Sequence, residues 1–79
     1  MTWHVAWHPR ALHRFYELPW KVAERLDAAV LKMAEGDLRG AMRLPDSRLL
    51  LVRVQGASAL VSADRGTALL FVVGVVPWK

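Results

Sequence analysis

The sequence contains no cysteine, few acidic residues and no long apolar run. Without cysteine the chain forms neither a disulfide framework nor a cysteine zinc site, and the cytoplasm is the default expected compartment. Its longest apolar run, residues 68–78, is shorter than the roughly 20 residues that a membrane helix needs. The first ten residues also lack the basic-then-apolar order of a signal peptide. These absences predict a domain that does not cross a membrane.

The residues that are present predict one compact domain spanning residues 1–79. A chain of 79 residues has room for one small core and for no second domain. Hydrophobic residues make up 54% of it, including four Trp. This composition is too apolar for a disordered segment.

Positive charge is concentrated in one stretch of the chain. The net charge is +4 overall, and residues 39–53 hold four Arg against one acid, which gives 4 − 1 = +3. Such a balance favours acidic partners, either nucleic acid or an acidic protein. A solvated rim without a partner is the alternative interpretation. The four residues are Arg39, Arg43, Arg48 and Arg53.

Periodicity predicts an α+β fold in the order β-α-α-β-β-β. Residues 3–8 alternate as a strand does, and two helical patterns follow that begin at Pro9 and Pro19, the second ending at Gly36. Residues 37–47 are expected to be irregular. Three strands then form an antiparallel meander over residues 48–54, 57–63 and 67–76, joined by Gln55-Gly56 and by a three-residue turn at 64–66. The helices should pack on one face as an αα-hairpin, with the apolar last strand closely packed on both of its faces.

Three stretches in this order resemble the RelE/ParE superfamily of bacterial type II toxins, over nearly the whole chain. The segment HPRALHRFYELP is similar to the opening helix of that family, with its Ala-Leu pair and closing Leu-Pro. The charged amphipathic helix WKVAERLDAAVLKMAEG is the second stretch, and residues 43–76 follow the family's meander and apolar final strand. The resemblance implies a small toxin that an antitoxin neutralises. It further implies two targets, mRNA on the ribosome or DNA gyrase.

The residues that ribonuclease members of this family use are mostly absent at the matching positions. Those members cut mRNA in the ribosomal A site with a Lys and Arg cluster on the concave sheet, because fixed cations must meet the charge that develops on the phosphate. Here Leu49 and Leu51 stand at two such positions, and Ala57-Ser58 stands where a Tyr-Arg pair is usual. Arg53 matches a family arginine that is often structural. Whether the chain is an enzyme is therefore left open, and no catalytic residue is assigned.

The candidates for binding nucleic acid or a partner are the basic and aromatic residues of the second half. A rim that docks an acidic antitoxin segment fits the scattered arginines better than a focused active site, and Trp78 favours packing or a partner contact over base stacking. The candidates are Arg39, Arg43, Arg48, Arg53, Trp78 and Lys79.

No metal or cofactor is expected. His4 and His8 would lie about 13 Å apart along a strand, too far to share one ion. No glycine-rich phosphate loop and no nucleophile elbow occurs in the sequence.

Three functions are compatible with these features. The chain is either a toxin that binds its target, a catalytically degenerate RelE-fold binding module, or a small RNA-binding domain without nuclease activity. The exposed sheet edge leaves a homodimer open as well.

Overall fold

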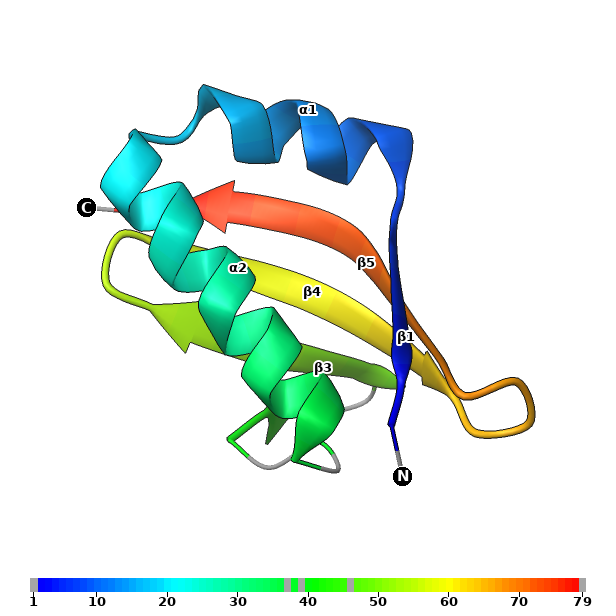
Figure 1. The fold of residues 1–79 in the computed structure, drawn as a ribbon. Coiled ribbons are helices and arrows are strands. Elements are labelled where there is room, and N and C mark those ends of the chain that lie inside the picture. The colour runs from blue at the N-terminus through cyan, green and yellow to red at the C-terminus, as the bar shows by residue number, and fades with distance from the viewer. Residues whose placement is uncertain (1, 37, 39, 46, 79) are drawn as a thin grey trace.

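The computed structural model describes residues 2–36, 38, 40–45 and 47–78. Two helices lie on one face of a five-stranded sheet whose strand order is β1-β5-β4-β3-β2 (Figure 1). The predicted α+β fold is confirmed, with one addition: a two-residue strand in the segment expected to be irregular. The elements are β1 (His4–Trp7), α1 (Pro9–Glu17), α2 (Trp20–Glu35), β2 (Met42–Arg43), β3 (Leu49–Val54), β4 (Ala57–Asp64) and β5 (Leu69–Pro77).

The helices begin and end where the sequence signals place them. Pro9 occupies the first turn of α1, and the His8 Nδ1 atom accepts a hydrogen bond from the Arg10 backbone N–H at 3.1 Å. This bond satisfies one of the N–H groups that have no partner inside a helix. Leu18 is extended before Pro19, so the chain turns at once into α2 and no loop separates the two helices.

The sheet mixes one parallel pair with an antiparallel meander. β1 pairs with β5 in parallel, while β3, β4 and β5 run antiparallel. The register between β4 and β5 shifts at Leu60/Val61, so that Val61 pairs with Val72 and Leu60 with Gly74. One extra residue on β5, Val73, produces this β-bulge, which bends the strand locally.

The turn between β4 and β5 differs from the prediction. It spans residues 65–68 rather than 64–66, and the residue with positive φ is Ala68 (φ 54), not Gly66. The Asp64 side chain accepts a hydrogen bond from the Gly66 backbone N–H at 3.0 Å. This Asp64 contact stabilises a longer turn that the positions of Gly and Asp alone do not reveal. The two-residue loop at Gln55-Gly56 is confirmed.

The core lies between the helices and the sheet. Alternate residues of the central strands face the helices, including Val52, Ala59 and Val61, all almost fully buried. Leu26 and Val30 of α2 are completely buried against this layer. The small side chains of β4 let α2 approach the sheet closely, which is why a short chain still closes one core.

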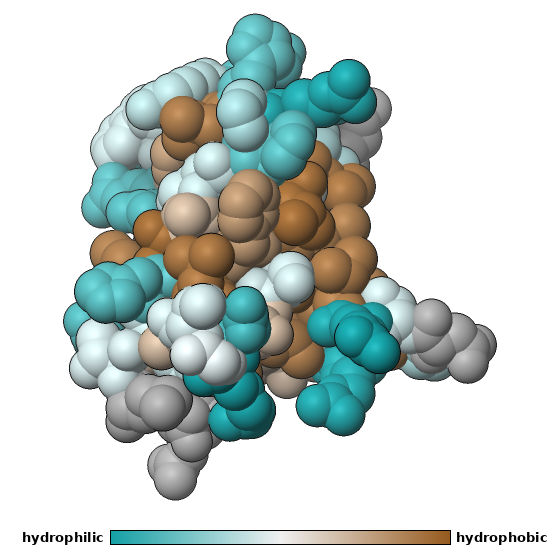
Figure 2. All heavy atoms as spheres, turned by 90° about the vertical axis from the view of Figure 1, so that its right-hand side faces the viewer, coloured by the Kyte–Doolittle hydropathy of each residue, from teal (hydrophilic) through white to brown (hydrophobic). Residues whose placement is uncertain are grey.

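The other face of the sheet is not covered, contrary to the prediction for the last strand. Both helices lie on one side of the sheet, and hydrophobic side chains reach the opposite side of the molecule (Figures 1 and 2). Val73 and Val76 of β5 remain 37% and 49% exposed. The last strand is apolar on both of its faces, but within this chain only one of them is packed.

None of the helices in the described part of the chain is long and apolar enough to cross a membrane.

Candidate functional site

The uncovered sheet face is an apolar surface that the topology creates. We call it the open face and define it by the strand residues whose side chains point away from the helices. Cross-strand pairs in an antiparallel sheet share a face, so the register identifies these residues directly. They alternate with the core residues along β3, β4 and β5. The apolar members are Met42, Leu49, Leu51, Leu60, Leu69, Phe71 and Val76.

Few polar groups interrupt the open face. Ser58 and Ser62 of β4 lie on it, and Ser58 is only 8% exposed. Among the described strand residues, Arg53 is the only Lys or Arg that the register places there. Leu49 and Leu51, which stand where the sequence resemblance implies basic residues in ribonuclease members, pair with Ser62 and Leu60. The described part of the open face thus lacks the cation cluster that phosphodiester cleavage by the RNA 2′-hydroxyl needs.

The single open-face arginine is itself engaged by an aromatic ring. The Arg53 guanidinium carbon lies 4.0 Å from the centroid of the Trp78 ring. Trp78 is fixed further by a hydrogen bond from its backbone N–H to the Gly56 carbonyl oxygen at 3.0 Å. This cation–π stack holds both side chains at one corner of the sheet, where β3 ends and β5 ends.

An apolar hollow lies beside this stack. Its volume is about 350 Å³. The junction of the two helices, the Gln55-Gly56 loop and the end of β5 line it. Trp78 is 38% exposed, so one part of the ring packs and another part contacts solvent. A partly exposed indole that lines an apolar hollow suits a partner contact, because Trp is enriched among the residues that anchor interfaces. The lining residues are Leu18, Pro19, Val22, Gly56, Pro77 and Trp78.

The other predicted arginines that the structure describes lie at a different place on the sheet from Arg53. Arg43 and Arg48 line one cavity at the opposite end of β3, with Arg65 from the turn after β4. Arg48 lies five residues from Arg53, about 17 Å along the strand, and Arg43 pairs with Leu50, about 10 Å from Arg53 in the strand direction. The predicted basic rim is therefore two separate sites. Arg39 and Lys79, also predicted, lie outside the described residues.

Arg65 is the residue that sequence reasoning missed. It lies in a predicted turn, and its distance in sequence from Arg43 and Arg48 hides the cluster. The antiparallel pairing of β3 with β4 brings the end of β4 beside the start of β3, and this pairing is one that the sequence predicts. The expected antiparallel alignment of residues 48–54 with residues 57–63 is the sequence signal that would place Arg65 near Arg48.

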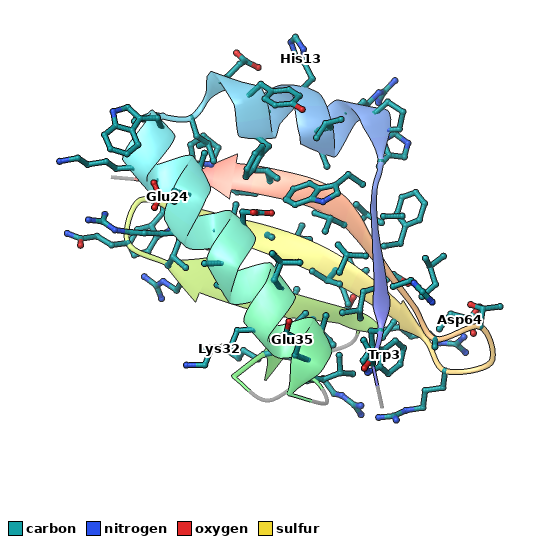
Figure 3. The ribbon with its side chains drawn as sticks, viewed as in Figure 1. Trp3, His13, Glu24, Lys32, Glu35 and Asp64 are labelled. Carbon is teal, nitrogen blue, oxygen red and sulfur yellow. The ribbon has the colours of Figure 1, made fainter. Side chains whose placement is uncertain are left out.

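The three histidines are distributed over different elements. His13 projects away from the sheet on α1 (Figure 3), and its Nε2 atom lies 3.5 Å from a Glu17 carboxylate oxygen. His8 caps α1 through its Nδ1 atom. His4 lies on β1, beside Leu69 of β5. Among the described residues no three His, Asp or Glu side chains are grouped closely enough to hold a metal ion.

Comparison with solved structures identifies the architecture. A chain of the intact E. coli RelBE toxin–antitoxin complex superposes with a TM-score of 0.86 at 17% identity, covering 99% of each chain. The isolated E. coli RelE toxin gives 0.84 at 15% identity, covering 99% of this chain and 86% of RelE. A chain of the RelBE2 complex from Mycobacterium tuberculosis gives 0.73 at 20% identity, covering 99% of this chain and 100% of that chain.

No protein-family model matches the sequence, and a search of curated proteins gives no significant match. The three-dimensional likeness nevertheless extends over nearly the full length of the chain. It includes the toxin in isolation as well as chains of two toxin–antitoxin complexes. The protein has the fold of the RelE toxins, as the sequence resemblance predicted.

Proposed function

We propose that this protein is the toxin component of a type II toxin–antitoxin module and that an antitoxin neutralises it by covering the open face. The observation that carries the proposal is the uncovered apolar side of a RelE-fold sheet. Solved structures of the same fold include toxin–antitoxin complexes. The fold and the exposed surface together favour a protein that binds a partner through the open face.

The exposed apolar residues support a protein partner on this face. Met42 is 56% exposed and Val76 is 49% exposed, at the two ends of the open face. Contiguous apolar surface of this kind marks interaction sites in soluble proteins, because leaving it in water costs free energy. The hollow beside Trp78 adds an anchor point at one corner.

The chemistry of the open face favours action by binding rather than by RNA cleavage. Cleavage requires fixed cations at the scissile phosphate and a group that moves protons. Arg53 is the one strand cation on this face among the described residues, and Trp78 occupies its guanidinium. We therefore propose that the toxin blocks its target, either the ribosome with its mRNA or DNA gyrase, as a bound inhibitor.

A growth assay tests the toxin function. Inducible expression of the chain alone should arrest bacterial growth, and co-expression of an antitoxin, which we expect to be a short acidic protein from an adjacent reading frame, should restore growth. The absence of arrest, in a host whose ribosomes and gyrase are susceptible, would overturn the toxin function. Primer extension on cellular mRNA and an assay for DNA breaks would then identify the target. Ribosome-dependent cleavage sites would contradict action by binding alone.

A pair of matched variants tests the docking surface. Val76 on the open face and Leu31 on α2 have nearly equal exposure, 49% and 48%. Val76→Glu should abolish co-purification of the antitoxin, because it places a charge in the apolar interface. Leu31→Glu should leave the complex intact. Equal loss in both variants, or retention in both, would contradict docking on the open face.

A second candidate follows from the same lack of cations on the described open face. This candidate is a catalytically degenerate RelE-fold module that binds a partner without harming the cell. It would form a complex with a partner on the open face, and its expression would not arrest growth. It shares the docking prediction for Val76 and differs only in the growth assay. The two experiments together separate the candidates.

A further inference from the structure

Three arginines surround one cavity on the helix side of the sheet, away from the open face. The cavity has a volume of about 450 Å³ and lies where the chain leaves α2 and enters β2 and β3. Arg43 belongs to β2, Arg48 precedes β3, and Arg65 follows β4. The three arginines thus come from three segments that the sheet pairing brings together. We call this site the arginine pocket.

The remaining lining residues divide into one hydroxyl and four apolar side chains. The Ser47 Oγ atom accepts a hydrogen bond from the Leu49 backbone N–H at 3.0 Å, which leaves the hydroxyl hydrogen available for a ligand. The apolar residues give the pocket a surface that suits an uncharged organic group. They are Leu38, Ala41, Leu50 and Ala63.

Positive charge in the pocket has no internal counterion among the described residues. The described lining includes no carboxylate, and the one ion pair in the described part of the chain joins His13 to Glu17 on α1. Asp64 lies next to Arg65 in sequence, but the two side chains form no salt bridge, and the Asp64 Oδ1 atom accepts the Gly66 N–H. Three arginines that line one cavity give it a positive potential, which solvent screens because all three are exposed, and this potential favours an anion in the cavity.

One of the arginines is also positioned in advance. The Arg65 guanidinium carbon lies 5.8 Å from the centroid of the Trp3 ring, and Trp3 is buried with only 3% of its surface exposed. Figure 3 shows Trp3 at the end of the sheet that carries the turn after Asp64. A guanidinium held against a fixed indole loses less conformational entropy when it binds an anion.

We propose that the arginine pocket binds a phosphate monoester whose organic part contacts the apolar residues. A phosphate monoester carries a charge of about −1.5 to −2 and three acceptor oxygens, which match several guanidinium forks. A phosphodiester inside a nucleic-acid backbone carries one charge only. The volume lies within the range of about 300–1,000 Å³ that is usual for small-molecule sites. The ligand is therefore a free nucleotide or the 5′-phosphorylated end of a nucleic acid.

Equilibrium titration of the purified full chain tests the proposal. The probes are adenosine monophosphate, adenosine, and a single-stranded RNA decamer with either a 5′-phosphate or a 5′-hydroxyl. We expect adenosine monophosphate to bind at least tenfold more tightly than adenosine. The phosphorylated decamer should bind more tightly than the hydroxyl form. Equal affinity of the two decamers would overturn the proposal, because it would show recognition of backbone phosphates alone.

The two sources of the phosphate are distinguished in the same titration. A free nucleotide is the ligand if adenosine monophosphate binds as tightly as the phosphorylated decamer. A nucleic-acid end is the ligand if the phosphorylated decamer binds at least tenfold more tightly than the mononucleotide. Adenosine monophosphate and adenosine binding with equal affinity would overturn both versions.

Charge-matched variants assign the binding to this pocket. Arg48→Gln and Arg65→Gln should each weaken adenosine monophosphate binding about tenfold or more. Arg14→Gln also removes one positive charge, but from α1, outside the pocket, so it should leave the affinity for adenosine monophosphate unchanged. Arg65→Lys keeps the charge and loses the planar fork, so it should give an intermediate affinity. Melting temperatures identify any variant that fails to fold. Similar losses in Arg14→Gln and Arg48→Gln would overturn the assignment, since they would show attraction by net charge alone.

Discussion

The guanidinium carbon of Arg53 lies 4.0 Å from the centroid of the Trp78 ring, across the start of β4. Arg53 pairs with Ser58 of β4, and Ser58 pairs in turn with Val76, two residues before Trp78. The stack therefore joins β3 to the end of β5 over the intervening strand. It also occupies the one open-face arginine of the described strands, so that this cation contributes to structure rather than to an exposed charge cluster.

The coupling between Arg53 and Trp78 is the first prediction. A double-mutant cycle with Arg53→Gln and Trp78→Leu should give a coupling free energy of about 0.5–1 kcal/mol, the range for partly exposed cation–π pairs. Urea unfolding followed by far-UV circular dichroism measures it. Arg48→Gln combined with Trp78→Leu is the control, and these two should be additive. Additive effects for Arg53 and Trp78 would show that the stack does not stabilise the fold.

The second prediction concerns the loss of stability when the glycine of the β3–β4 loop is replaced. Gly56 has φ +99, and a Cβ atom there would lie 2.9 Å from Cγ2 of Val22. Gly56→Ala should destabilise the protein by at least about 1–3 kcal/mol, measured by urea unfolding, through backbone strain and this close contact. The cost should be smaller in a Val22→Ala background, where only the strain remains. Gly40→Ala is the comparison, since Gly40 also has positive φ but a Cβ atom there would meet nothing within 4 Å.

The cap of α1 gives the third prediction. His8→Ala removes the acceptor for the Arg10 N–H and should lower the free energy of unfolding by about 0.5–2 kcal/mol. His8→Asn keeps a side-chain acceptor and should retain most of that stability. Thermal unfolding monitored at the helical circular dichroism band is the measurement. Equal destabilisation by both substitutions would assign the role of His8 to packing beside Phe71 instead.

A pair of leucines on α2 provides the fourth prediction. Leu26 has no exposed surface and Leu31 is 48% exposed. Leu26→Ala should cost about 2–5 kcal/mol because it leaves a cavity in the core. Leu31→Ala should change stability by less than about 0.5 kcal/mol. Denaturant midpoints with unchanged slopes would verify both values, and a large loss of stability in Leu31→Ala would contradict the exposed position of Leu31.

Much of the fold was predictable because its signals are local. Pro9, Pro19 and Gly36 fix the helix boundaries through backbone constraints that act within a few residues. Gly56 fixes the β3–β4 loop in the same way. The Asp64 turn was mispredicted because its conformation depends on one side-chain hydrogen bond, and the strand β2 because two residues carry no periodicity.

The candidate sites were less predictable because they depend on which side of the sheet remains uncovered. An apolar strand such as β5 has the same sequence pattern whether its second face meets a helix of its own chain or remains open. The arginine pocket depends on three segments, and only the pairing of β3 with β4 shows that Arg65 approaches Arg48. The five-residue spacing between Arg48 and Arg53 is odd, and on a regular strand it places the two side chains on opposite faces; this spacing argues against a single basic rim.

The parallel pairing of β1 with β5 has a consequence for the order of folding. His4 has its sheet partner at Leu69, so the first strand has no hydrogen-bonding neighbour in the sheet until the last strand is made. Such distant pairing slows folding, since a long loop must close before the contact is gained. We expect β3 and β4, which neighbour each other in sequence, to pair early, and β5 to complete the sheet between β4 and β1. The open face is therefore complete only once β5 has paired with both of these strands.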